Sequence, residues 1–312
     1  MTETHANAGT APAHVVPVWE VSPIRLWVLA RATFVQLVRM KVFYFLLIFV
    51  ALVLVVAAAG LFWLPTEHLI AIKRWSFGAM YLFTMVYSIS ATALLLPRDL
   101  EDRTLYTILS KPVPRIEYLI GRLCGVLLLN AVALAAMFLA MCLLVAWKMP
   151  AVEQQLVQQL LHGAAGEAVS LNEVNQAKAE AARYGLSTSL LWAVWALYLK
   201  ASVVSAVTLF ISTIASSSLF TIVSSAMVVF IGHFHQLILD FWKVNETGWF
   251  GGLIGRLLVI VFPNLSLFDV VDEVITGTSL SFGAGLQLTG MGLFYVALFV
   301  LVAQLVFVDK EL

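Results

Sequence analysis

The stretch PRDLEDRTLYTILSKPVPRIEYLIGR, residues 97–122, is the densest run of charge in the chain. The apolar segments on both of its sides are long enough to cross a bilayer, which takes about 20 residues. Asp99 and Arg103 lie one helical turn apart with the acid first, the favourable order for an ion pair on a helix. Two prolines in the second half lack backbone N–H groups, so a helix that begins near Asp99 should end near Ser110, and another should begin near Arg115. We therefore predict a short surface helix in water between two membrane spans.

The composition is that of an integral membrane protein. Hydrophobic residues make up 62% of the chain and charged residues 12%, whereas soluble domains have about 45–50% and 25%. Lys plus Arg and Asp plus Glu are equal at 18 each, so no basic excess indicates a nucleic-acid partner.

Hydropathy predicts an all-α fold with six transmembrane helices in one membrane domain, residues 22–312. The predicted spans are residues 43–64, 76–96, 118–147, 190–214, 219–232 and 286–308. Residues 1–21 carry no Lys or Arg and no apolar core, so we expect a disordered tail rather than a signal peptide.

A helix is predicted before the first span. Ser22 can act as its N-cap, Pro23 fits its first position, and helical periodicity continues to Lys41. Apolar and polar side chains cluster on opposite sides of it. The apolar set is Trp27, Phe34 and Val38, and the polar set is Arg25, Gln36 and Arg39. Such a helix lies along a membrane surface, and the alternative is that it extends the first span into the cytosol.

Two further segments interrupt the predicted spans. Residues 148–187 form a polar insertion, in which residues 152–161 predict one helix that ends at Gly163, and a capping box at Ser170 and Glu173 predicts another. We expect a small helical hairpin outside the membrane. Residues 251–262 are short for a span and contain Arg256, so we expect a re-entrant or interfacial hairpin before the last span.

The basic residues set the expected orientation. With the N-terminus in the cytosol, the cytosolic segments hold more of the 18 Lys and Arg residues than the outer segments do. We therefore expect a multi-pass protein of the cytoplasmic membrane, with both termini and the 97–117 loop in the cytosol and the 148–187 insertion outside.

Catalytic motifs are missing from the sequence. No glycine is followed by lysine, which excludes a P-loop, and neither H-E-x-x-H nor G-x-S-x-G occurs. His233 and His235 are two positions apart and could form a pair of metal ligands. Two histidines without further evident ligands are more typical of a membrane interface than of a metal site. Lys200 lies inside the fourth span, where a charge usually lines a pathway; a Ser–Lys hydrolase dyad is the alternative. We predict no catalytic residue, cofactor or metal site.

The charged stretch and its surroundings resemble a permease of the type-2 ABC exporter family. In that family, acidic residues, a Gly-Thr or similar pair and then Leu-Leu-Ser-x-Pro-Val-x-Arg follow the second span. The matching positions here are Asp99, Glu101, Asp102, Arg103, Thr104, Ile108, Leu109, Ser110, Pro112, Val113 and Arg115. Arg103 departs from the pattern, because glycine is common at its position. PNLSLFD at 263–269 and the closing residues 310–312 are also similar to the family, so the resemblance covers nearly all of the chain except the tail and the insertion.

The resemblance implies a cytosolic coupling helix that docks on a separate ATP-binding subunit. The residues expected to make that contact are Asp99, Glu101, Asp102, Thr104, Leu105, Ile108, Leu109, Ser110 and Arg115. It also implies two ATP-binding subunits, a second permease subunit beside this one, and export driven by ATP hydrolysis in the partner, with Lys200 as a candidate pathway residue. An ion-coupled secondary transporter that uses Lys200 is the alternative function, and an intramembrane hydrolase is a third.

Overall fold

The computed structural model describes residues 22–59, 65–101, 114–163, 172, 174–176, 178–179, 185–215, 217–235, 237, 262–278 and 280–309. These residues form helices and connecting turns, with no strand among them. The helices are α1 (Pro23–Val38), α2 (Lys41–Ala59), α3 (Pro65–Glu101), α5 (Arg115–Gly163), α7 (Ser189–Ile214), α8 (Ser218–His233), the short 3-10 helix η1 (Ser266–Phe268), α11 (Val271–Ile275) and α12 (Phe282–Asp309).

Four helices of the described part are long and apolar enough to cross a membrane, as expected of a multi-pass membrane protein. They contain residues 68–95, 116–160, 189–214 and 282–307. The first and fifth predicted spans coincide with α2 and α8, whose apolar stretches Leu46–Ala57 and Ser218–His233 are shorter. The all-helical fold is therefore confirmed, while the count of six spans stays a prediction.

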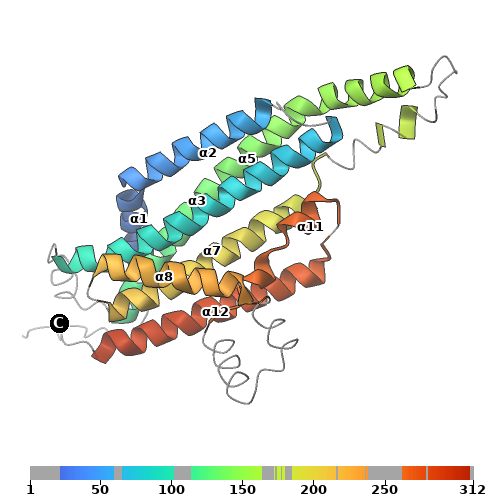
Figure 1. Ribbon diagram of the computed structural model, residues 1–312. Coiled ribbons are helices and arrows are strands. Elements are labelled where there is room, and N and C mark those ends of the chain that lie inside the picture. The colour runs from blue at the N-terminus through green and yellow to red at the C-terminus, as the bar shows by residue number, and fades with distance from the viewer. Residues whose placement is uncertain are drawn as a thin grey trace, which may run out of the picture.

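The long helices run roughly alongside one another in a bundle (Figure 1). Helix α1 crosses one end of it, which we call the α1 end, and α11 lies at the opposite, α11 end. The last residues of α3, the first residues of α5 and the last residues of α12 meet at the α1 end. Helix α5 continues beyond the bundle at the α11 end.

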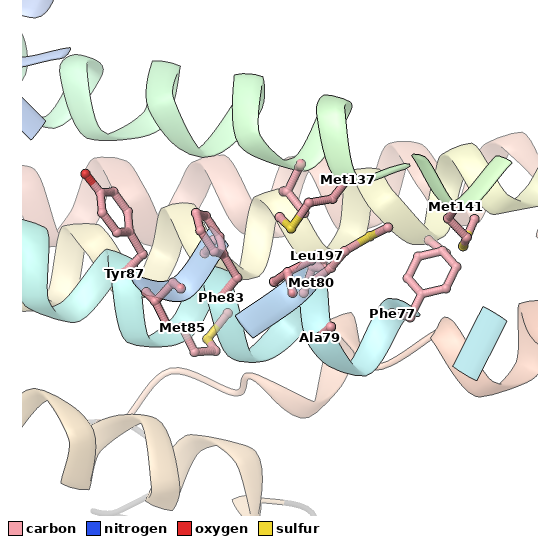
Figure 2. Packing of buried hydrophobic residues seen from close by; sticks show 14 of the residues in the cluster. Phe77, Ala79, Met80, Phe83, Met85, Tyr87, Met137, Met141 and Leu197 are labelled. Carbon is pink, nitrogen blue, oxygen red and sulfur yellow. The ribbon is translucent and has the colours of Figure 1, made fainter. Parts of the chain in front are cut away.

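Helix α7 is the most enclosed helix of the bundle. Every residue from Leu199 to Leu209 is buried, which fits a helix surrounded by others on all sides. On α3, buried Phe77, Met80, Phe83 and Tyr87 follow one another at helical spacing. Figure 2 shows these four side chains beside the methionines that α5 contributes at 137 and 141.

Glycines allow α1 and α5 to approach each other closely. A Cβ atom added at Gly125 would lie 2.4 Å from the Thr33 Cβ and 2.8 Å from the Ala30 carbonyl oxygen, and one at Gly121 would lie 2.6 Å from the Leu29 Cβ. Neither distance leaves room for a side chain, so only glycine permits this contact. Small serine side chains are also buried in α7 and α8, namely Ser202, Ser205, Ser212 and Ser225.

Two helices continue through prolines that were predicted to lie at or near helix boundaries. Helix α3 extends through Pro97 to Glu101, so the prediction of a separate helix beginning near Asp99 is wrong at its start. Helix α5 continues through Pro150, so residues 152–161 extend it instead of forming a separate arm of a hairpin. A proline removes one backbone hydrogen bond, and a long helix packed along much of its length tolerates that loss.

Other predicted boundaries agree with the structure. Helix α5 begins at Arg115 and ends at Gly163, and α1 begins after an extended Ser22 with Pro23 at its first position. Outside the described residues lie the predicted tail at 1–21, most of the expected re-entrant segment at 251–261, and the capping-box residues Ser170 and Glu173.

We expect Gly125→Val to lower the free energy of unfolding by about 1–3 kcal/mol, because the new side chain would overlap α1 and force it away from α5. Thermal unfolding of the purified protein in detergent would measure this change. Gly290→Val on α12 is the matched control, because nothing lies within 4 Å of a Cβ at that position. Equal loss of stability in both variants would contradict the assigned contact.

Candidate functional site

Lys200 lies near the middle of α7, and its side chain faces the interior of the bundle. It is fully buried. Its Nζ atom lies 2.5 Å from Oδ1 of Asp269 and 3.4 Å from Nδ1 of His233. The same ammonium group lies 4.8 Å from the centroid of the Tyr81 ring, which adds a cation–π contact.

Asp269 links three elements of the fold. It follows η1 and precedes α11, and its second oxygen, Oδ2, lies 3.2 Å from Nδ1 of His233 at the end of α8. The side chains of Asp269 and His233 remain 38% and 42% exposed. We call the cluster of Lys200, Asp269, His233 and Tyr81 the Lys200 cluster.

Local packing places Asp269 in this position. Leu265, directly before η1, and Phe268, the last residue of η1, are buried. The Leu265 N–H donates to the Gly232 carbonyl at 3.1 Å. A Cβ at Gly232 would lie 2.7 Å from the Pro263 carbonyl oxygen, so glycine at the end of α8 lets the 262–277 segment approach. The segment is therefore held against α8 directly before the carboxylate.

A cavity of about 320 Å³ lies beside the Lys200 cluster and is lined in part by residues of α11. Its lining combines apolar side chains with charged groups. The lining residues are Arg74, Phe77, Gly78, Tyr81, Leu197, His233, Phe268, Asp269, Val271, Asp272 and Ile275. Such a cavity can hold a small molecule that has one polar end and an apolar body.

The geometry gives Lys200 no serine partner in the described part of the chain. Ser202 and Ser205, the nearest serines along α7, donate to the backbone carbonyls of Tyr198 and Ala201. A Ser–Lys dyad needs a hydrogen bond between the two side chains. The described residues around Lys200 form an ion pair instead.

The two histidines of the candidate metal pair have different surroundings. His233 contacts Asp269, whereas His235 is buried, and burial lowers the pKa of the His235 imidazole and so favours its neutral form. The described residues contain no group of three or more His, Cys, Asp or Glu side chains that could hold a metal ion.

A second polar cluster joins α1 to α5 at the α1 end. Glu117 is fully buried, and its Oε1 accepts hydrogen bonds from the Ser22 backbone N–H at 2.7 Å and from Arg25 Nη2 at 2.9 Å. Arg25 Nε lies 2.9 Å from the other carboxylate oxygen. Five residues further along α5, a second arginine, Arg122, donates from Nη1 to side-chain oxygens of α1. These are Thr33 Oγ1 at 3.1 Å and Gln36 Oε1 at 2.9 Å. We call this set the α1–α5 clamp.

The clamp changes the interpretation of α1. Arg25 and Gln36 were expected to face away from the apolar side of the helix and toward water, but both bind α5. Ile24, Trp27 and Val28 are exposed instead. Arg25 and Gln36 turn toward α5 because it offers them buried charged partners, whereas Arg39 stays exposed and Phe34 and Val38 pack against the core.

Three of the nine predicted coupling residues lie within the described structure. Asp99 and Glu101 belong to the last turns of α3, and Arg115 is the first residue of α5. The rest, namely Asp102, Thr104, Leu105, Ile108, Leu109 and Ser110, lie outside the described residues.

Sequence reasoning missed the partners of Lys200 and the clamp. An intramembrane lysine signals that an anion must lie near it, and Asp269, Asp272 and Glu273 offered three carboxylates in one run. Spacing could not select Asp269 among them. Nothing in the sequence indicated that Glu117 would be buried, apart from its position a few residues after Pro112 and Pro114.

Comparison of the sequence with models of protein families gives no match, and comparison with curated proteins gives none either. We therefore argue function from the two polar clusters and the cavity.

We expect Lys200→Met and Asp269→Asn each to lower the free energy of unfolding by about 2 kcal/mol, because each leaves one charge without its partner. Breaking a fully buried pair costs about 3–5 kcal/mol, and the exposure of Asp269 reduces that cost. The double variant should recover at least half of the summed loss in unfolding experiments.

Asp272→Asn is the matched control for this cycle, because its carboxylate makes no ion pair within the described residues and is exposed. Strict additivity of Lys200→Met and Asp269→Asn would contradict the assigned pair.

Proposed function

We propose that this chain is the membrane-spanning subunit of an ABC exporter complex, in which a separate ATP-binding subunit supplies the energy. The observation that carries the proposal is the α1–α5 clamp. It lies at the first turns of α5, directly after residues 97–114 of the charged stretch, and joins that helix to α1 through buried polar contacts. A force applied to the stretch would therefore move α1 and α5 together.

Helix α3, on the N-terminal side of the charged stretch, leads to the cavity. Helix α3 runs without interruption from Tyr81, which lines the cavity, to Glu101 in the charged stretch. This length of helix covers about 30 Å. A continuous helix packed along its buried face is suited to carry a displacement from the α1 end to the cavity.

The charged stretch has the chemistry of a docking element. Its acidic groups would meet basic residues of an ATP-binding subunit, and its apolar residues would fill a groove on that subunit. In this proposal the contact residues are Asp99, Glu101, Asp102, Thr104, Leu105, Ile108, Leu109, Ser110 and Arg115. The complex would contain two ATP-binding subunits and a second permease subunit, and Lys200 would lie beside the substrate pathway.

A second candidate function is ion-coupled secondary transport. The Lys200 cluster favours it, since a buried lysine paired with a carboxylate and a histidine beside a cavity is also suited to ion coupling. The two functions differ in their energy source. Transport by the purified chain alone, driven by an ion gradient without ATP, would favour the second.

We expect the double substitution Glu101→Lys/Asp102→Lys to reduce binding of the ATP-binding subunit at least tenfold, because it would place like charges at the contact. Leu105→Asp should have a similar effect by introducing an unpaired charge at an apolar contact. Co-purification and the ATPase rate of the complex measure both. Asp309→Lys, in the last turn of α12 at the same end of the bundle, is the matched charge control. Unchanged co-purification and ATPase rate in both test variants would contradict the proposed coupling role.

The proposed orientation has its own test. In a background in which Cys124 and Cys142 are replaced by alanine, single cysteines are placed at Thr107 and Gln158. A membrane-impermeant maleimide should label Gln158→Cys in intact cells and Thr107→Cys only after the inner face is opened, because the basic residues favour a cytosolic 97–117 loop. The reverse labelling pattern would contradict this orientation.

A further inference from the structure

The ammonium group of Lys200 is stable in its buried position only beside an anion. It is fully buried in α7, and its anionic partner among the described residues is Asp269. A buried charge that loses its partner is strongly unfavourable. Any movement that takes Asp269 away must therefore either bring another anion to Lys200 or remove the proton from its amine.

Asp269 belongs to a segment that is separate from the long helices. The 262–277 segment contains only η1, of three residues, and α11, of five. Buried Leu265, Phe268, Val274 and Ile275 and the hydrogen bond from Leu265 to Gly232 hold it on the bundle. Its carboxylate is 38% exposed and lines the cavity, whereas the lysine lies behind it. A molecule in the cavity thus meets Asp269 first and Lys200 directly beyond.

The cavity can hold the rest of such a molecule. Phe77 and Leu197 provide apolar walls from α3 and α7, which remain in place if the 262–277 segment moves. His233 provides a second nitrogen beside the Asp269 carboxylate, and Arg74 adds a positive charge on the exposed part of the lining. These groups suit an acid with an apolar chain.

We propose that the cavity binds an amphipathic anion, whose acidic group replaces Asp269 on Lys200 and His233 and whose apolar chain lies against Phe77 and Leu197. The exchange keeps Lys200 paired and releases the 262–277 segment from α7. A cation would be attracted by Asp269 and Asp272 but would give Lys200 no replacement partner. The site deepens the proposed transport function by naming its substrate class, and its test needs no ATP-binding subunit, so each can fail separately.

The test uses the full chain in nanodiscs of phosphatidylcholine and two probes with similar apolar chains and opposite head-group charge, sodium octanoate and octylammonium chloride. Calorimetry should detect binding of octanoate and at least tenfold weaker binding of octylammonium. Octanoate should also speed hydrogen exchange in the 262–277 segment, including the Leu265 amide, because release of Asp269 loosens that segment. Equal binding of the two probes, or slower exchange with octanoate, would overturn the proposal.

Variants of the two paired residues should change octanoate affinity in opposite directions. Lys200→Met should weaken binding about tenfold or more, since the anion loses its main partner. Asp269→Asn should tighten it severalfold, because the competing carboxylate is gone; a purely structural ion pair gives no such gain. Glu273→Gln is the control and should leave affinity unchanged, because Glu273 is an exposed acid of the same 262–277 segment that does not line this cavity. Weaker binding to Asp269→Asn would refute the exchange even if Lys200→Met did not fold.

The acidic group could belong to a soluble acid or to a membrane lipid. Replacing part of the phosphatidylcholine by phosphatidylglycerol distinguishes the two sources. A competitive loss of octanoate affinity would support the anion site with lipid as its occupant. An unchanged affinity would support the same site with a soluble acid as its ligand.

Discussion

The charge of Lys200 lies where water cannot solvate it, and the surrounding structure depends on how that charge is balanced. Lys200 is part of an 11-residue run, 199–209, that is buried on every side. Asp269 neutralises the charge of Lys200. It lies on a short segment between η1 and α11 and not on one of the long helices. That segment is held by Gly232, whose missing side chain leaves room for it. One buried charge thus joins α7, α8 and the 262–277 segment.

The two polar clusters lie at different levels of the bundle and have different surroundings. The α1–α5 clamp is built from residues of two packed helices, with Glu117 fully buried between them. The Lys200 cluster borders a cavity, and its carboxylate remains partly exposed. Closely packed glycines accompany the clamp, so it holds α1 and α5 as one unit. The Lys200 cluster borders a cavity that could admit another partner, whereas the clamp lies between two closely packed helices. The Lys200 cluster suits binding, and the α1–α5 clamp suits transmission of force.

The sequence predicted the class of fold and most of its helices. Helix α7 was expected at 190–214 and is found at Ser189–Ile214, because an uninterrupted apolar run with one charge has few other ways to satisfy its backbone in a membrane. The ends of α3 and α5 were predicted less well. Pro97 and Pro150 are local signals for a helix boundary, but packing along the neighbouring turns outweighs the loss of one hydrogen bond at each.

By itself, the sequence determined that this is an all-helical membrane protein, that its charge is concentrated between two apolar helices, and that Lys200 needs a partner. These properties follow from composition and from contacts within a few residues. Only the tertiary structure decided which partners are used. Lys200 contacts Asp269, which is 69 residues away in sequence, and Arg25 contacts Glu117, which is 92 residues away. Several carboxylates could have served each cation, and the choice among them depends on how the helices pack, which no local pattern encodes.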